Sequence, residues 1–161
     1  MEESLLNPGT IAPDFSLLGD DSQVHSLKDF AEGELVIFFY PKDLTPGCTT
    51  EACDFSDSLG EFQAMSAQVV GISQDSLASH ARFKSKHTLR MLLLSDPDLA
   101  VHKLYGAYGE KHMYGKTTLG VIRSTFLIDK TGKIIRSWYK VRVKNHAHAV
   151  LETLKKWRSK T

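Results

Sequence analysis

The segment LVIFFYPKDLTPGCTTEAC, residues 35–53, places an apolar run directly before the start of an amphipathic stretch. The run Leu35–Tyr40 is continuous, which favours a strand buried on both faces. Thr45 is a residue type typical of a helix N-cap, and Pro46 suits the first helical position because its missing N–H would have no partner there. The segment therefore predicts a buried strand that leads into a helix, as in α/β folds.

The helix predicted after Thr45 carries the only two cysteines of the chain, Cys48 and Cys53. Cys48 falls in its first turn, where unpaired backbone N–H groups and the positive end of the helix dipole favour a thiolate. A thiol in this position is placed for reaction more often than for packing. Apolar residues at helical spacing predict that the helix runs from about Thr45 to Met65 with one face toward the protein body: Cys48, Ala52, Phe55, Leu59, Phe62 and Met65.

The spacing of the two cysteines limits how they can react with each other. Cys53 lies five positions after Cys48, so an intact helix sets their Cα atoms about 8 to 9 Å apart, beyond the roughly 7 Å limit for a disulfide. A bond between them requires the first helical turns to unwind. The spacing therefore predicts a protein with two states and not one with a permanent disulfide.

The composition is that of an ordinary soluble globular protein, with 24% charged and 42% hydrophobic residues. The length of 161 residues predicts one domain over residues 1–161. The net charge is +1 and there is no long basic block, which argues against nucleic acid and membrane surfaces as partners. The first residues, MEES, lack the pattern of a targeting peptide, and two cysteines in such a chain fit a reducing compartment. We therefore expect a cytoplasmic protein.

Strand and helix signals alternate along the rest of the chain. We expect a hairpin of residues 13–18 and 23–25, a helical turn at 26–30, a strand at 67–73, a helix at 75–87, a strand at 91–94, a helix from 95 to about 105, a glycine-containing loop at 106–120, a hairpin of 121–128 and 133–143, and a final helix that aligns Ala147, Val150, Leu151, Leu154 and Trp157. This order predicts an α/β, thioredoxin-like fold with an N-terminal β-hairpin and further extensions.

The sequence PKDLTPGC, residues 41–48, resembles the active-site pattern P-x-x-x-T-x-x-C of the peroxiredoxins. With Glu51-Ala52-Cys53 after it, the stretch is similar to the peroxiredoxin Q group, also called bacterioferritin comigratory protein. Segments 71–76, 93–97, 120–129 and 138–141 extend the resemblance over nearly the whole chain. It implies a single AhpC/TSA-type domain with peroxiredoxin insertions, and reduction of hydrogen peroxide and organic hydroperoxides at a thiolate without metal, haem or other cofactor.

The resemblance also implies roles for individual residues. Cys48 takes the position of the peroxidatic cysteine, and Cys53 that of the resolving cysteine in members that carry one in the same helix. Thr45 and Pro41 shape the pocket, and Arg123 matches the arginine of an R-S-T-F segment. Thioredoxin or a similar dithiol is the implied reductant, and a monomer is the implied assembly.

The chemistry of such a site can be followed from the residues themselves. Attack on a peroxide needs a thiolate, and Arg123, placed in the apolar strand expected at 121–128, is a cation that could approach it. Glu51, one turn after Cys48, could hold the guanidinium by a bidentate contact. The Thr45 hydroxyl and nearby backbone N–H groups could bond the peroxide oxygens. The product is a sulfenic acid at Cys48, which Cys53 would convert into a disulfide after unwinding.

Simpler interpretations remain open at this point. Cys53 could be an idle thiol, Arg123 an exposed charge on an edge strand, and Glu51 only a first-turn acid that complements the helix dipole. The protein could also be a thiol–disulfide oxidoreductase, although it lacks C-x-x-C, or a binding module switched by oxidation. No His or Cys pair has zinc-site spacing, and we expect most of the seven histidines at the surface.

Overall fold

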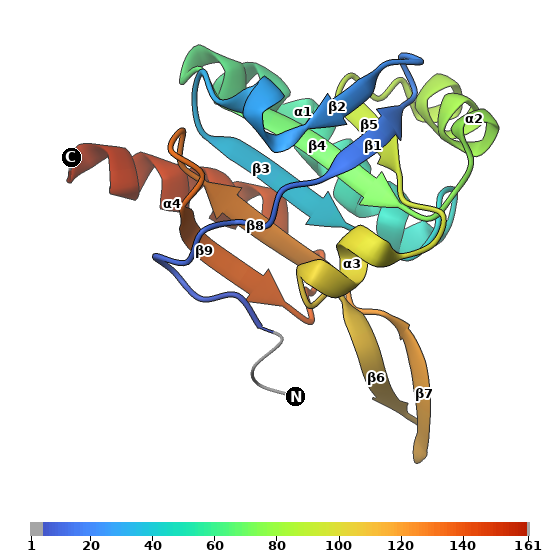
Figure 1. Cartoon of the computed structure of the whole chain (residues 1–161). Coiled ribbons are helices and arrows are strands. Elements are labelled where there is room, and N and C mark those ends of the chain that lie inside the picture. The colour runs from blue at the N-terminus through green and yellow to red at the C-terminus, as the bar shows by residue number, and fades with distance from the viewer. Residues whose placement is uncertain (1–4, 161) are drawn as a thin grey trace.

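A seven-stranded sheet in the order β2-β1-β5-β4-β3-β8-β9 forms the centre of the structure, a computed structural model that describes residues 5–160 (Figure 1). The inner strands β3, β4 and β5 run parallel, while β1, β8 and β9 join antiparallel to their neighbours. The strands are β1 Ser16–Gly19, β2 Val24–Ser26, β3 Leu35–Phe39, β4 Gln68–Ser73, β5 Leu92–Ser95, β8 Ser124–Ile128 and β9 Ile134–Tyr139. The arrangement confirms the α/β, thioredoxin-like fold.

Helices cover both faces of this sheet. One face packs against α1 (Pro46–Ala64), α2 (Leu77–His87) and α4 (His146–Ser159). The other packs against α3 (Ala100–Leu104) and the 3-10 helix η2 (Leu27–Phe30). All five residues of β3 are buried, because Val36 and Phe38 point toward α1 while Leu35, Ile37 and Phe39 point to the opposite layer. This confirms the buried strand predicted from the apolar run.

Most of the other predicted elements are present with ends shifted by a few residues. The N-terminal hairpin is β1–β2, the turn at 26–30 is η2 with a capping box, and the final helix is α4. The helix expected from residue 95 begins only at Ala100, because Leu99 adopts a left-handed backbone conformation with φ of 62°. No helix in the described part of the chain is long and apolar enough to cross a membrane.

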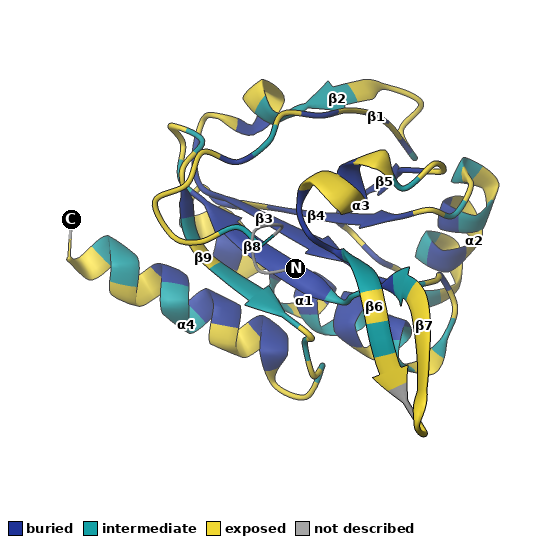
Figure 2. Ribbon diagram, turned by 60° about the horizontal axis from the view of Figure 1, so that its bottom comes forward, coloured by how far each residue is buried: buried dark blue, intermediate teal, exposed yellow. Residues whose placement is uncertain are grey.

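The prediction of a loop at residues 106–120 is wrong. Residues 108–121 form a separate two-stranded hairpin, here called the arm, of β6 (Tyr108–Met113) and β7 (Lys116–Val121). Gly109 and Gly120 pair with each other across its strands, and only Gly115 lies in its turn, at φ of 76°. The arm projects from the body and is largely exposed (Figure 2). It therefore lacks the alternation of apolar and polar residues that marks a half-buried strand.

The arm also changes the placement of Arg123. The strand expected at 121–128 is divided, because Val121 ends β7 and β8 begins at Ser124. Arg123 therefore lies in the short connection between the arm and the central sheet. Because this connection is not part of a strand, the direction of its side chains is not set by the alternation along a strand, and Arg123 can turn toward α1.

Candidate active site

The junction of β3 and α1 sets the position of Cys48. Thr45 is the N-cap of α1, with an extended backbone, and Pro46 is the first helical residue, as predicted. The Thr45 hydroxyl makes no capping bond and instead donates to the Lys42 carbonyl at 2.8 Å. Cys48 falls in the first turn and is 1% exposed, at the foot of the apolar helix face. The thiol is therefore sheltered at the positive end of α1.

One guanidinium joins Cys48 to Glu51. Arg123 Nη2 lies 3.3 Å from Cys48 Sγ, and Arg123 Nη1 lies 2.7 Å from Glu51 Oε1. The bidentate Arg123–Glu51 contact expected from the sequence is therefore wrong, because the second nitrogen faces the sulfur. Glu51 Oε2 is buried and has no hydrogen-bond partner among the described residues. Arg123 is 17% exposed, so it is not a charge on an exposed strand edge.

Burial and charge compete at this triad. Burial raises the pKa of Glu51 to about 7, although the Arg123 charge and hydrogen bond oppose the rise. The pKa of Arg123 is raised, because the neighbouring Glu51 and Cys48 outweigh the effect of burial. A cation that stays protonated next to a sulfur favours the thiolate form of that sulfur. The triad can therefore stabilise an anionic nucleophile in a largely dry environment.

A pocket of about 340 Å³ opens beside Arg123. Its walls combine apolar and polar side chains from four segments: Pro41, Glu110, Lys111, His112, Ile122, Arg123, Lys140 and Val141. Pro41 is thus on the wall, as predicted, while Thr45 is not among the lining residues. The three lining residues from β6 of the arm were missed, because the exposed arm lacks the alternation of apolar and polar residues that indicates a strand. The pocket therefore leads to the guanidinium that contacts Cys48.

Cys53 lies in the second turn of α1 and is half-buried. It packs at the edge of the cluster that contains Phe55 and Leu59. Both cysteines are free thiols, and α1 is continuous through both. Burial raises the pKa of Cys53, and the charges of Asp57 and Asp54 raise it further. The structure therefore corresponds to the reduced state, with a second thiol that ionises less readily.

Four of the seven histidines are exposed or partly exposed, in line with the expectation that most lie at the surface, and three are buried: His80, His102 and His146. His146 packs edge-on against Phe55 and Trp138 and contacts the Thr125 hydroxyl at 2.8 Å. Burial, and then the Arg123 charge, lower its pKa to about 4, so it is neutral at physiological pH. Within residues 5–160, no three His, Cys, Asp or Glu side chains gather closely enough to hold a metal ion.

Comparisons with known proteins identify the family of this chain. Residues 8–137 match the AhpC/TSA family. The chain is 46% identical over 147 residues to peroxiredoxin Bcp of Bacillus subtilis, covering 91% of this chain and 94% of that protein. Its structure superposes on the bacterioferritin comigratory protein of Xanthomonas campestris, which has alkyl peroxide reduction activity, with a TM-score of 0.85, 41% identity and coverage of 94% and 96%. The Xylella fastidiosa peroxiredoxin Q gives a TM-score of 0.89, 37% identity and coverage of 95% and 98%.

These matches extend over almost all of the chain, and they confirm the resemblance carried by residues 41–53. The structural likeness likewise includes 94% and 95% of this chain. The chain therefore belongs to the AhpC/TSA family, as a thiol peroxidase of the peroxiredoxin Q, or bacterioferritin comigratory protein, group.

Proposed function

We propose that Cys48 is the peroxidatic residue of this protein and that its substrates are hydrogen peroxide and organic hydroperoxides. The thiolate attacks one peroxide oxygen, so that an S–O bond forms while the O–O bond breaks. Two electrons pass from sulfur to the peroxide, and the departing oxygen takes up a proton and leaves as water or an alcohol. The observation that carries this proposal is the 3.3 Å contact between Arg123 Nη2 and Cys48 Sγ.

The surrounding residues have separate roles in this step. Arg123 stabilises the thiolate and the negative charge that builds on the departing oxygen. Glu51 orients Arg123 through its single contact of 2.7 Å. The Thr45 hydroxyl donates its hydrogen to the Lys42 carbonyl, so its oxygen can accept a hydrogen bond from the O–H of a hydroperoxide. Pro41 forms part of the wall against which the substrate lies.

Cys53 is proposed to resolve the sulfenic acid. Its sulfur attacks Cys48, the S–S bond forms as the S–O bond breaks, and the oxygen leaves as water with the thiol proton. The first turns of α1 must unwind for this step, because Cys48 and Cys53 lie five positions apart in one continuous helix. An external dithiol, most simply a thioredoxin, then restores both thiols by exchange and becomes a disulfide itself.

Intact-mass measurement after one equivalent of peroxide tests the two assignments. The wild type should lose two hydrogens as the disulfide forms. Cys53→Ser should gain oxygen at Cys48, because attack is preserved and resolution is lost, and Cys48→Ser should remain unmodified. Peroxide consumption by Cys48→Ser at the wild-type rate would overturn the assignment of the peroxidatic residue.

We further propose that the protein acts as a cytoplasmic monomer with thioredoxin as its reductant. Two free cysteines suit a reducing compartment, which supports the location. Peroxide turnover coupled to a thioredoxin system distinguishes this activity from a plain thiol–disulfide oxidoreductase, which would reduce disulfides without consuming peroxide. Light scattering on the eluting reduced protein gives the assembly state, and a mass of two chains would contradict the monomer.

A further inference from the structure

The loop between β3 and α1, residues 41–45, is here called the active-site loop, and it carries both Pro41 and Thr45 toward Cys48. Its fourth residue, Leu44, has a left-handed backbone conformation with φ of 64°. A bulky non-glycine residue adopts this conformation at a cost, so it persists only where the surrounding structure holds it. The loop therefore needs an anchor within reach of Leu44.

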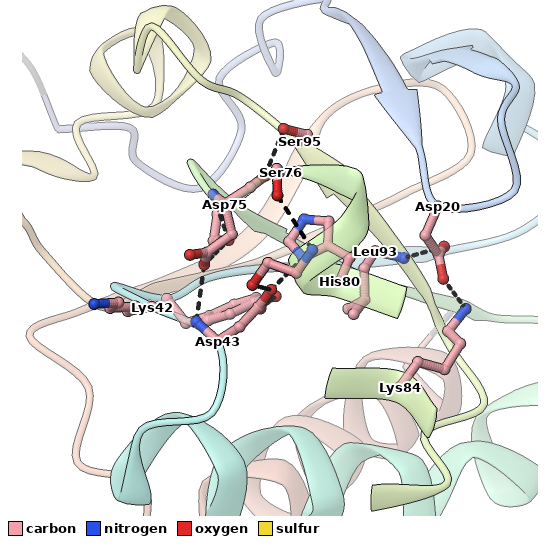
Figure 3. Close-up of polar contacts among 12 residues, drawn as sticks. Asp20, Lys42, Asp43, Asp75, Ser76, His80, Lys84, Leu93 and Ser95 are labelled. Carbon is pink, nitrogen blue, oxygen red and sulfur yellow. Dashed lines mark hydrogen bonds and ion pairs between the residues drawn. The ribbon is translucent and has the colours of Figure 1, made fainter. Parts of the chain in front are cut away.

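Asp43, the residue before Leu44, is 4% exposed and forms this anchor. Its carboxylate accepts hydrogen bonds from the Tyr40 hydroxyl at 2.6 Å and from the Ser79 hydroxyl at 2.8 Å, and it contacts His80 Nδ1 at 2.7 Å. Its backbone N–H donates to Asp75 at 2.8 Å. Figure 3 shows Asp43, Asp75 and His80 converging on one point between the loop and α2. The loop is therefore held through its side chain and its main chain together.

The partners of His80 define its protonation. His80 Nε2 lies 2.9 Å from the Leu94 carbonyl, which can only accept, so this nitrogen carries a hydrogen. His80 Nδ1 faces Asp43 Oδ2, which already accepts from Ser79, so Nδ1 carries a hydrogen as well. A histidine that donates from both nitrogens is an imidazolium, and the ionised Asp43 balances its charge.

A second buried Asp–His pair lies against the opposite face of the sheet, and only one ring nitrogen of its histidine has a hydrogen-bond partner among the described residues. His102 Nδ1 contacts Asp96 Oδ2 at 2.6 Å, and the ring packs against Phe39. His102 Nε2 is buried and has no hydrogen-bond partner among the described residues. His102 therefore needs one hydrogen where His80 needs two, and it contacts no residue of the active-site loop. This pair is a matched control for the first.

We propose that Asp43 and doubly protonated His80 are positioning residues that hold the active-site loop in its attacking geometry and oppose the unwinding of α1. This inference rests on the proposed function, which supplies the unwinding step. When the pair is intact, the strained Leu44 turn is retained and Cys48 stays beside Arg123. When it is broken, release of the turn shifts the equilibrium toward the unwound form in which Cys53 can reach Cys48.

The pair makes this equilibrium depend on pH. Burial lowers the pKa of His80, but the hydrogen bond and charge of Asp43, the Leu94 carbonyl and the Asp75 charge outweigh it and raise the pKa overall. The stabilisation is therefore complete below the ordinary histidine pKa of about 6.5 and is lost as the pH rises through the raised value.

Other charged groups near the pair do not replace His80. Burial and the Asp43 charge raise the pKa of Tyr40 well above its ordinary value, so this hydroxyl remains neutral. Lys84, on the same helix as His80, forms its ion pair with Asp20 at 2.5 Å (Figure 3). Asp75 adds a second negative charge and also favours the imidazolium.

Nitrogen-15 NMR of histidine-labelled wild-type protein tests the protonation directly and needs no variant. At neutral pH, both ring nitrogens of His80 should carry hydrogen, while Nε2 of His102 should not, in the same spectrum. An unprotonated nitrogen on His80 would overturn the proposal. This measurement uses no peroxide, so its outcome is independent of whether the proposed peroxidase chemistry is correct.

Hydrogen exchange on reduced variants tests the effect on the loop. Protection factors, from which the intrinsic pH dependence of exchange has been removed, should fall about 10-fold for residues 42–50 in Asp43→Asn and His80→Gln, and stay unchanged in His102→Gln. The wild-type protection of this segment should fall with rising pH. His80→Gln should remove the part of that dependence that comes from the pair and keep the part that comes from Glu51. Equal protection in His80→Gln and wild type, or equal loss in His102→Gln, would contradict the positioning role.

A kinetic comparison separates positioning from general destabilisation. His80→Gln should attack peroxide more slowly yet need more peroxide for over-oxidation of Cys48, because the loosened loop favours resolution over a second attack. In His102→Gln, the rate of peroxide attack and the amount of peroxide needed for over-oxidation should not move in opposite directions, even if the variant is less stable overall. If His80→Gln and His102→Gln change the attack rate and the peroxide needed for over-oxidation in the same way, His80 has only a structural role.

Discussion

Cys48 and Cys53 lie five positions apart in α1, yet their surroundings differ in burial and in charge. Cys48 is 1% exposed and touches the Arg123 guanidinium at the positive end of the helix. Cys53 is half-buried, and burial raises its pKa, with the carboxylates of Asp57 and Asp54 raising it further. A cation stabilises one thiolate while anions disfavour the other. The comparison predicts that the charges around each thiol, in addition to the helix end, decide which of the two attacks peroxide first.

Removal of Arg123 is expected to have the largest effect on this contrast. Arg123→Ala should slow peroxide attack by about 10²-fold or more and shift alkylation of Cys48 to higher pH. Arg123→Lys should restore only part of the rate, because an ammonium cannot face Glu51 and the sulfur with two fixed nitrogens. The measurements are single-turnover peroxide reduction and the pH dependence of alkylation.

Arg136→Ala is the matched control for this prediction. Arg136 is exposed on β9, where its guanidinium lies 4.9 Å from the centre of the Trp138 ring. Its removal should leave both measurements unchanged. An unaltered profile in Arg123→Ala would mean that the helix end suffices to activate Cys48.

Oxidation should remove the helical geometry that separates the two thiols. Formation of the Cys48–Cys53 bond should unwind the first turns of α1 and abolish about four to six backbone hydrogen bonds. Amide exchange over residues 46–54 should then accelerate while the central sheet stays protected. Hydrogen exchange on the reduced and oxidised protein makes the measurement. Full protection of this segment in the disulfide form would show that the cysteines join without unwinding.

Glu51 should make the stability of the Cys48 site depend on pH. Its pKa is raised from 4.5 to about 7, so the native state holds a proton that the unfolded chain has already lost between these values. Stability should therefore fall as the pH rises through this window, and Glu51→Gln should flatten the curve. Urea unfolding of both proteins at about pH 5 and about pH 8 makes the comparison. Peroxide attack should slow only a few-fold, because glutamine still accepts from Arg123.

Glu152→Gln is the control for the pH prediction, because Glu152 forms an exposed ion pair with Lys155. Exposed pairs contribute little to stability, so its curve should follow the wild type. If Glu51→Gln also follows the wild type, the carboxyl is not protonated in the folded protein at mildly acidic pH.

The acidic neighbours of Cys53 should have the smallest effect. Asp57→Asn, made in the Cys48→Ser background, should lower the pKa of Cys53 and raise its alkylation rate near neutral pH by about two- to five-fold, because half-exposed charges are screened. Asp98→Asn, in an exposed turn beyond β5, serves as the control. No change in Asp57→Asn would show that burial alone makes Cys53 the less acidic thiol.

The parts of the site that lie close together in sequence could be predicted from it. The apolar run and the Thr45-Pro46 pair are local signals, and β3, the start of α1 and the position of Cys48 follow from them. The separation of the two thiols in the intact helix could be anticipated for the same reason, since it depends on a spacing within one helix.

The parts that were missed depend on contacts between distant residues. The run from Val121 to Ile128 begins and ends with apolar residues, which favours one strand. Nothing local reveals that the arm ends before Arg123 and that the Arg123 side chain turns toward α1. His80 is buried because it meets Asp43, 37 positions away, and such a pair leaves no pattern in either segment. Glu51 and Arg123, 72 positions apart, were paired from charge alone, and only the structure shows that the contact uses one nitrogen.

The arm has a consequence for how substrate preference can change in this family. It forms its own two-stranded sheet, and one hydrogen bond at its base, from the Ile122 N–H to the Ala107 carbonyl at 2.8 Å, marks where it departs from the body. It nevertheless supplies Glu110, Lys111 and His112 to the pocket beside Arg123. Its length and side chains can therefore be exchanged without altering a strand pair of the central sheet. Substitutions in the arm are therefore expected to alter the proposed substrate pocket, and with it the preference among peroxides, while the contact between Arg123 and Cys48 is kept.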